Sequence, residues 1–595
     1  MSVLLVAINS KFSHTNLAVR SIAYYVKENL PEADIHFDEW TIQEPVLNIL
    51  RGISAYNPKV VVFSTYIWNC TQIYAVANEL KKILPDVLIG AGGPEVSYKD
   101  IHFFDENPAF DFLVKGEGEK ITLELCKLLY GKSDLFKDEF ESRNVDYFDF
   151  FESFVKYNYM LDLAKFNLEL IDDLSVLPFP YPEFLPENQR KHILGPVAHP
   201  ENRILYYESS RGCPFSCSYC LSSIDKTVRF MPLERVFSDL QIFLDAKVKL
   251  VKFVDRTFNL NENRYIKIWE YIKNHYNGIT RFHFEIAAEC LSDAALDFIK
   301  DMPENSIQFE IGVQSIHPKT LEEVGRKANL DNLSRIIQKI PEFIHVHLDL
   351  IAGLPYESLK DFRNSFDYTF KLKPNMLQLG FLKILEGTKM ENFAKNHDFK
   401  FLSLPPYEVL ETPDISWNEL LFLKNVEELN DAYWNSGNFS KVFDYLLSFD
   451  EFSPFDFYAS LKDFAEKSSD FETALTQPHK SDFWFELIFA YFDRQSLLDE
   501  KIFSSSFDKD VAKDLIKFDF IAMGKTSIFP SWYNHVYSKD AHHQALLAHT
   551  DMHSTRLAYA NSNYEEFDVN PFDFAKGKTK VLFLYDSGKV KSVLL

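Results

Sequence analysis

The chain has 595 residues, 46% of them hydrophobic and 25% charged, which predicts a globular protein of roughly three or four domains. Its formal net charge of −24 argues against a broad nucleic-acid-binding surface, because such surfaces rest on clustered Lys and Arg. No apolar run approaches the ~20 residues that cross a bilayer, and no signal peptide begins the chain, so the predicted compartment is the cytoplasm.

Residues 1–134 alternate short apolar runs with amphipathic segments. Strands are predicted at 3–8, 35–40, 59–64, 87–90 and 112–115, and helices at 17–29, 73–84 and up to residue 129. This alternation predicts a doubly wound, Rossmann- or flavodoxin-like α/β domain, which binds ligands at the carboxyl ends of its strands. Residues 135–200 break the pattern, and six prolines between 178 and 200 predict a linker.

Strand signals resume in residues 201–400, at 204–209, 250–254, 282–287, 306–312, 345–351 and 376–382. Helical segments separate them, which predicts a (β/α)6 partial TIM barrel. Residues 401–595 predict a mainly helical, aromatic-rich domain with a helix at 417–435, capped by Gly437, and a terminal β-hairpin that turns at 586–589.

Three of the six cysteines lie within RGCPFSCSYC (211–220), directly after the first barrel strand. Thiolates ligate iron–sulfur clusters and structural zinc. A closed zinc site wants four ligands, usually as two pairs, but no second pair follows here. The remaining cysteines, Cys70, Cys126 and Cys290, are isolated and are expected to be small buried hydrophobes. A zinc knuckle completed by a histidine is the alternative to a cluster with one open iron.

RGCPFSCSYC resembles the cluster loop of radical S-adenosylmethionine (SAM) enzymes, in which an aromatic residue precedes the last cysteine of C-x3-C-x2-C. The resemblance implies a [4Fe-4S] cluster on Cys213, Cys217 and Cys220. Its open iron would bind SAM, which is then cleaved to a 5′-deoxyadenosyl radical. Tyr219 would back the SAM molecule.

Later segments resemble the coproporphyrinogen-oxidase branch of that superfamily, namely FEIAAECLSD, GVQS, EEVGRKAN and HLDLIAGLPYES. The resemblance implies SAM contacts from Glu289 (with Glu285 as competitor), Gln314, Arg326 and Asp349. KFVDRTFN (252–259) stands where the family carries a glycine-rich motif, so Asp255 and Thr257 are the SAM candidates there. For each of these residues, the alternative is a strand-end side chain that satisfies backbone groups.

Residues 1 to about 390 resemble the cobalamin-binding radical SAM subfamily on FSTY (63–66), GAGGPE (90–95) and GEGE (116–119). The resemblance implies cobalamin contacts from Ser64, Thr65, Gly92, Gly93, Gly116 and Glu117. NSKFSHTNLA (9–18) replaces the D-x-H-x-x-G loop of cobalamin domains. Cobalamin is therefore expected without a histidine on cobalt, and His14 is expected to hydrogen-bond locally. A nucleotide-binding flavodoxin-like fold is the alternative.

The resemblance implies an enzyme that methylates an unactivated carbon of a small-molecule or peptide substrate, with an electron donor such as flavodoxin or ferredoxin. Radical cyclisation or rearrangement without methyl transfer is one alternative, and a non-catalytic metal-binding scaffold is another. A tRNA methylthiotransferase is disfavoured because residues 439–475 are acidic and no second set of cluster cysteines exists. Specificity is expected in residues 401–595, as a cover over the barrel mouth. His542, His543, His549 and His553 are expected at the surface without a metal.

Overall fold

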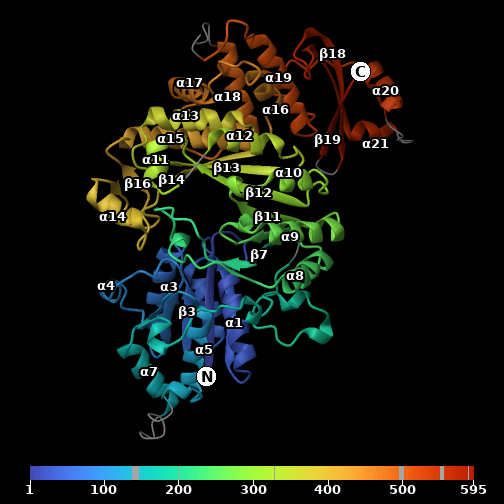
Figure 1. Cartoon of the computed structure of the whole chain (residues 1–595). Coiled ribbons are helices and arrows are strands. Elements are labelled where there is room, and N and C mark those ends of the chain that lie inside the picture. The colour runs from blue at the N-terminus through green and yellow to red at the C-terminus, as the bar shows by residue number, and fades with distance from the viewer. Residues whose placement is uncertain (137–145, 200, 327–328, 495–501, 550–554, 587–588) are drawn as a thin grey trace.

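A computed structural model describes residues 1–136, 146–199, 201–326, 329–494, 502–549, 555–586 and 589–595. Three regions follow one another along the chain: an α/β domain, a parallel barrel and a mainly helical region, with the barrel in the middle (Figure 1). The predicted fold class is confirmed. Among the described residues, no helix is both long and apolar enough to cross a membrane.

The first domain is built on a six-stranded parallel sheet in the order β2-β1-β3-β4-β5-β6. Its strands are β1 (Ser2–Asn9), β2 (Asp34–Thr41), β3 (Val60–Ser64), β4 (Leu88–Gly92), β5 (Phe112–Val114) and β6 (Met160–Leu161). The helices of this domain are α1 (Leu17–Asn29), α2 (Val46–Ala55), α3 (Cys70–Ile83), α4 (His102–Glu106) and α5 (Gly118–Leu129). The apolar, β-branched run VVVFS of β3 suits a strand that is covered on both faces.

Residues 135–200 do not form the plain linker that the sequence predicted. Helix α7 (Tyr147–Tyr157) packs against α5 and buries Phe151 and Val155, and β6 extends the sheet beside β5. In the proline-rich part, the fully buried Tyr181 accepts a hydrogen bond from the Tyr206 backbone N–H and donates one to its carbonyl, both at 2.9 Å. Tyr181 also lies 3.1 Å from the Thr15 hydroxyl, so it ties this part of the chain to both domains.

The barrel consists of six parallel strands in the order β14-β13-β12-β11-β10-β7. They are β7 (Ile204–Tyr207), β10 (Leu250–Phe253), β11 (Arg281–Ile286), β12 (Ile307–Gln314), β13 (His345–Ala352) and β14 (Met376–Phe381). The helices between them are α8 (Leu233–Asp245), α9 (Glu262–His275), α10 (Asp293–Ile299), α11 (Pro318–Glu323), α12 (Leu330–Lys339) and α13 (Leu359–Lys371). Side chains alternate, so Phe284 packs against Trp269 of α9 while His283 lies inside, 3.0 Å from Glu310.

The C-terminal region contains α15 (Trp417–Asn430), a π-helical turn (Asp431–Asn435), α16 (Ser440–Leu446), α17 (Pro454–Lys467), α18 (Ser481–Arg494), α19 (Lys509–Met523), α20 (Lys539–His549) and α21 (Thr555–Ala560). Gly437 follows with φ of 70°, as expected of a cap. The chain ends in an antiparallel sheet of β17 (Ser562–Val569), β18 (Lys576–Asp586) and β19 (Lys589–Leu594), of which β17 was not predicted.

Helices α15 to α19 of the C-terminal region do not cover the barrel mouth, so the expectation of a cover is wrong for them. Phe366 of α13 packs against Phe455 of α17, and Asn435 exchanges two hydrogen bonds of 2.9 Å with the Leu377 backbone on the outer strand β14. The region therefore covers the outside of α13 and the free edge of the open barrel, which would otherwise expose unpaired backbone groups. Figure 1 shows its helices on the far side of the barrel from the first domain, whereas Tyr407, near the start of the region, donates a hydrogen bond to Glu95 of the first domain.

Candidate active site

A short hairpin frames the cysteine loop at the carboxyl end of β7. β8 (Ser210–Arg211) pairs antiparallel with β9 (Arg229–Phe230). Gly212 lies between strand and loop with φ of 93°, and a Cβ there would be 2.2 Å from the Thr227 carbonyl oxygen. Only glycine fits this approach. The buried Cys213 then donates its backbone N–H to the Asp225 carbonyl at 3.0 Å.

Two further segments hold the other end of the loop. The Ser218 N–H donates to the Val324 carbonyl at 3.0 Å, and the Ser218 carbonyl accepts from the Met390 N–H at 2.8 Å. Cys213 Sγ lies 3.8 Å from Thr257 Oγ1. Within the described parts of the chain, no three His, Cys, Asp or Glu side chains form a group that could hold a single metal ion.

The cysteines outside the loop are poor candidates for ligands. Cys70 and Cys126 are buried, as predicted, and burial raises the pKa of Cys70 to about 11 and that of Cys126 to about 12. Both therefore stay neutral thiols at neutral pH. Cys290 is only half-buried, which corrects the expectation of a core residue, because it lies at the end of a short 3-10 turn.

Tyr219, Gln314, Arg326 and Asp349 of the predicted SAM set lie at the same end of the barrel. Arg326 donates to the Tyr219 hydroxyl at 3.3 Å and to the Gly312 carbonyl at 2.7 Å. Gln314 follows at a bulge in β12 with φ of 71°, and its Oε1 is buried without a hydrogen-bond partner among the described residues. The same holds for Asp349 Oδ1 on β13. Burial, reinforced by Glu310 and Glu285, raises the pKa of Asp349 to about 8. Unpaired buried polar atoms are what a polar ligand would satisfy.

The other predicted SAM residues are placed differently. Both Asp255 oxygens accept hydrogen bonds of 2.7 Å from Ser209 and Ser210, so this carboxylate holds the end of β7. Thr257 donates to the Arg256 carbonyl at 2.7 Å beside Cys213. Glu289 is exposed, whereas its competitor Glu285 lies on the inner face of β11, where burial raises its pKa to about 7.

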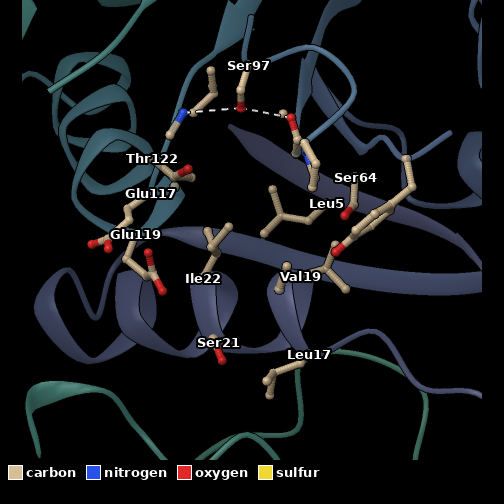
Figure 2. A pocket seen from close by; sticks show the side chains of 18 of the residues that line it. Leu5, Leu17, Val19, Ser21, Ile22, Ser64, Ser97, Glu117, Glu119 and Thr122 are labelled. Atoms are coloured by element: carbon tan, nitrogen blue, oxygen red, sulfur yellow. Dashed lines mark hydrogen bonds between the residues drawn. The ribbon is translucent and has the colours of Figure 1, made fainter. Parts of the chain in front are cut away.

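A cavity of about 460 Å³ lies between the first domain and the barrel mouth. The predicted cobalamin residues Ser64, Gly92, Gly93, Gly116 and Glu117 line one side, at the carboxyl ends of their strands. Figure 2 shows Val19 and Ile22 of α1 facing the strand residues Leu5 and Ser64, with Glu117 and Glu119 on another side. The barrel contributes Glu208, Arg211, Leu221, Ser222, Val254 and Arg256.

Glycine backbone forms part of the cavity wall. A Cβ on Gly93, whose φ is 106°, would lie 2.6 Å from the Thr65 carbonyl oxygen. Ser97 donates to the Gly93 carbonyl at 2.9 Å and accepts from the Gly116 N–H at 3.3 Å, which ties two strand ends together (Figure 2). Thr65 itself is fully buried and does not line the cavity, so it packs beneath the wall. A cavity whose wall combines apolar side chains with bare glycine backbone fits a large flat cofactor such as cobalamin.

An ion-pair network closes one side of this cavity, and sequence reasoning missed most of it. Arg211 donates to Glu119 and to Glu208, each at 2.8 Å, and lies 3.2 Å from Glu117. Arg229 pairs with the same Glu117 at 2.5 Å. Burial alone would raise the pKa of Glu119, but the Arg211 charge and hydrogen bond outweigh it and hold that pKa below its usual value. Both residues lie next to motifs that the sequence analysis identified: Arg211 stands two residues before Cys213, and Glu119 is the last residue of GEGE. Their position beside these motifs could have marked them as candidates.

The predicted histidines occupy unexpected places. His14 Nδ1 lies 2.5 Å from the Tyr206 hydroxyl of the barrel, and His14 does not line the cavity. The expected local hydrogen bond is made by its backbone N–H, which donates to the Lys11 carbonyl at 3.1 Å, while its ring reaches across the domain boundary. His542 is buried against Ser562 at 2.9 Å, which corrects its predicted surface position, whereas His543 and His549 are exposed. His553 lies outside the described residues.

Family models match three stretches of the chain. They describe a B12 binding domain at residues 3–125, the radical SAM superfamily at 207–369, and a protein of unknown function (DUF4080) at 395–576. The first two stretches contain the two walls of the cavity.

Similar proteins include the cobalamin-dependent radical SAM methyltransferase TokK of Streptomyces tokunonensis, 28% identical over 68% of this chain and 58% of TokK. The 2-(S-pantetheinyl)-carbapenam-3-carboxylate methyltransferase of Streptantibioticus cattleyicolor is 26% identical over 55% of this chain and 47% of its own. The chain thus spans less than two thirds of either relative. The solved structure of the methyltransferase TsrM of Kitasatospora setae shares the fold, with a TM-score of 0.52 and 14% identity over 69% of this chain and 80% of TsrM.

Proposed function

From the premise that this chain is a radical SAM protein with an N-terminal B12-binding domain, we propose that it methylates an unactivated carbon of its substrate. The two domains imply a [4Fe-4S] cluster, SAM and cobalamin. When bound, these groups supply a 5′-deoxyadenosyl radical and a transferable methyl group. The observation that carries the proposal is the single cavity lined by both domains, since a methyl donor and a radical source must reach the same carbon.

Each of the two domains has a stated task in this proposal. Cys213, Cys217 and Cys220 would hold the cluster on the framed loop. Tyr219, Gln314, Arg326 and Asp349 would orient SAM, because two of them carry buried polar atoms that lack partners among the described residues. Ser64, Gly92, Gly93, Gly116 and Glu117 would hold cobalamin at the strand ends of the first domain.

The ion pairs of Arg211 keep the two walls together and help to exclude water from the space between them. Exclusion of water protects a reactive radical from side reactions. The protein's contribution is therefore orientation and enclosure, while the cofactors supply the bond-breaking chemistry.

An external one-electron donor, such as a flavodoxin or ferredoxin, would reduce the cluster. A reducing cytoplasm suits a chain whose six cysteines are all free thiols. Support for methyl transfer also comes from the relatives, since TokK and the carbapenam enzyme are both named as methyltransferases.

Anaerobic reconstitution with methyl-labelled SAM tests the function. We expect cleavage of SAM to 5′-deoxyadenosine and transfer of label to carbon of a small-molecule or peptide fraction. Cleavage with product formed but no transferred label would replace methylation by cyclisation or rearrangement. Label on an inserted sulfur would indicate methylthio transfer, and no cleavage at all would leave a metal-binding scaffold.

A further inference from the structure

One cation at the cavity has no partner. The charged residues that line the cavity are Glu117, Glu119, Glu208, Arg211 and Arg256. Arg211 is ion-paired with all three glutamates, at 3.2 Å, 2.8 Å and 2.8 Å. The Arg256 guanidinium makes no hydrogen bond or ion pair with any residue that the structure describes, and its side chain is exposed.

Arg256 stands at the junction of the two walls. It follows β10 and lines the cavity together with Val254 of the barrel and Tyr66 of the first domain. Burial raises the pKa of Tyr66 and of Glu285, and the Arg256 charge works against both shifts, which places the guanidinium near each group. Arg256 is therefore at the mouth, above the interior of the barrel.

Neighbouring charges do not neutralise it. Glu310 is paired with another cation, because the ammonium of Lys252 on β10 lies 3.7 Å from it. The adjacent Asp255 is directed to Ser209 and Ser210. Acids outnumber bases by 24 in this chain, so a shortage of carboxylates does not explain the unpaired guanidinium. Burial raises the pKa of Glu285 to about 7, so its compensating negative charge is incomplete at neutral pH.

We propose that Arg256 binds an anionic group of the substrate, a carboxylate or a phosphate, where the two walls meet. The inference rests on the proposed function, because a substrate methylated there must lie between SAM and cobalamin. A guanidinium presents a planar fork of donors that matches both anions, and such charge-assisted pairs fix orientation as well as position. The substrate class is thus an acid whose charge is held at the barrel mouth.

Arginine labelling with phenylglyoxal tests the site in the intact protein. Holoenzyme carrying cluster and cobalamin, without reductant, is labelled with and without SAM, and modified peptides are quantified by mass spectrometry. Acetate and inorganic phosphate are the probes, with chloride at matched ionic strength. We expect Arg256 to be labelled in both forms. A probe at about ten times its Kd should slow that labelling about tenfold.

Two arginines serve as internal controls. The exposed Arg51 on α2 should be labelled at the same rate with every anion, and the ion-paired Arg211 should resist labelling throughout. Protection of Arg256 by SAM alone, or its loss of reactivity on cobalamin loading alone, would assign the guanidinium to a cofactor and overturn the proposal. Equal labelling in acetate, phosphate and chloride would overturn it as well.

The labelled product provides a second, independent readout. Product that carries the methyl label from SAM should be retained on an anion exchanger at neutral pH. Labelled product that contains neither a carboxylate nor a phosphate by mass spectrometry would overturn the proposed substrate class while leaving methyl transfer intact. Anion protection of Arg256 without any methyl transfer would instead support the anion site and overturn the proposed function.

Discussion

The two domains that meet at the cavity differ in how their polar groups are satisfied. On the first-domain wall, Glu117 and Glu119 are ion-paired with arginines, and the rest of the surface is apolar side chain, glycine backbone and hydroxyl residues such as Ser64 and Ser97. In the barrel, Gln314 Oε1 and Asp349 Oδ1, which do not line the cavity, are buried without partners among the described residues, and Arg256 at the cavity has no described counter-ion.

This difference separates a surface that binds by shape from one that binds by polar contact. An unsatisfied buried polar atom costs about 1–3 kcal/mol, a cost that a ligand can remove. The charged side chains on the first-domain wall are ion-paired without a ligand, while Gln314 Oε1 and Asp349 Oδ1 of the barrel would find partners when a polar molecule is bound. The predictions below test this contrast, from the largest expected effect to the smallest.

The largest expected effect concerns the cysteine loop. If the barrel bound and cleaved SAM without these cysteines, the contrast between the two domains would be wrong. We expect Cys213→Ala to abolish cluster assembly and SAM cleavage, because three thiolates are the only cluster ligands proposed. Iron content and 5′-deoxyadenosine formation measure this. Cys290→Ala is the matched control and should retain both. Equal iron in the two variants contradicts the assignment.

Removing Arg211 tests whether the first-domain wall depends on its ion pairs. Arg211→Met leaves the buried Glu119 and the partly buried Glu208 without their partner, and we expect a loss of about 3–5 kcal/mol in the free energy of unfolding. Arg494→Met removes an exposed pair with Asp470 and should cost less than about 1 kcal/mol. Similar melting temperatures for the two variants would show that the network is dispensable.

The pH dependence of the Arg211 effect follows from Glu119. Its pKa is depressed in the folded protein, so the stabilisation is present above the unfolded pKa and is lost as the pH falls through the folded value. The gap in melting temperature between the wild type and Arg211→Met should therefore narrow in acid. A gap that is constant down to the acid range contradicts the ion-pair explanation.

Filling the glycine wall tests binding by shape. We expect Gly93→Ala to lose about 2 kcal/mol of stability or more and to weaken cobalamin binding, since the new Cβ meets the Thr65 carbonyl at 2.6 Å. Gly278→Ala has a similar φ of 76° but no atom within 4 Å of the new Cβ, so it should cost less and leave cobalamin binding unchanged. Cobalamin titration compares the two.

The unpartnered Asp349 should give the barrel side a distinct pH response. Burial raises its folded pKa to about 8, so its contribution to stability is full below the unfolded pKa and is lost as the pH rises toward 8. The slope is at most about 1.4 kcal/mol per pH unit. Asp349→Asn removes this slope. The free energy of unfolding of the variant, relative to that of the wild type, should therefore rise on the order of 1.4 kcal/mol per pH unit between pH 5 and pH 8. If the free energies of unfolding of the two proteins changed with pH in parallel, the raised pKa of Asp349 would be contradicted.

The smallest effect concerns His14, which joins the first domain to the barrel. His14→Gln loses the hydrogen bond to Tyr206 and should cost about 1 kcal/mol. Electron paramagnetic resonance of bound cob(II)alamin should show no histidine nitrogen coupling in either protein. A nitrogen coupling that is present in the wild type and absent from His14→Gln would place this histidine on cobalt.

Local patterns predicted much of the fold. The apolar run of β3, the helical spacing of α1 and the six barrel strands are visible because burial imposes a period on neighbouring residues. β6 was not predicted because a strand of two residues is too short to show an alternating pattern. α7 was not predicted because residues 135–200 were interpreted as a linker. Both elements form because they complete the first domain, which is a tertiary effect.

By itself the sequence determined the cofactor chemistry, since the spacing of Cys213, Cys217 and Cys220 and the glycines of the first domain are properties of short segments. Only the tertiary structure decided how those segments meet. Arg211 and Glu119 are 92 residues apart in sequence, yet they form one ion pair. Asp255 carries the right charge for a ligand contact but already accepts hydrogen bonds from two serines, while Arg256 beside it has no described partner. Hydrogen bonds and ion pairs depend on distances of a few ångströms, which sequence spacing does not specify between distant segments.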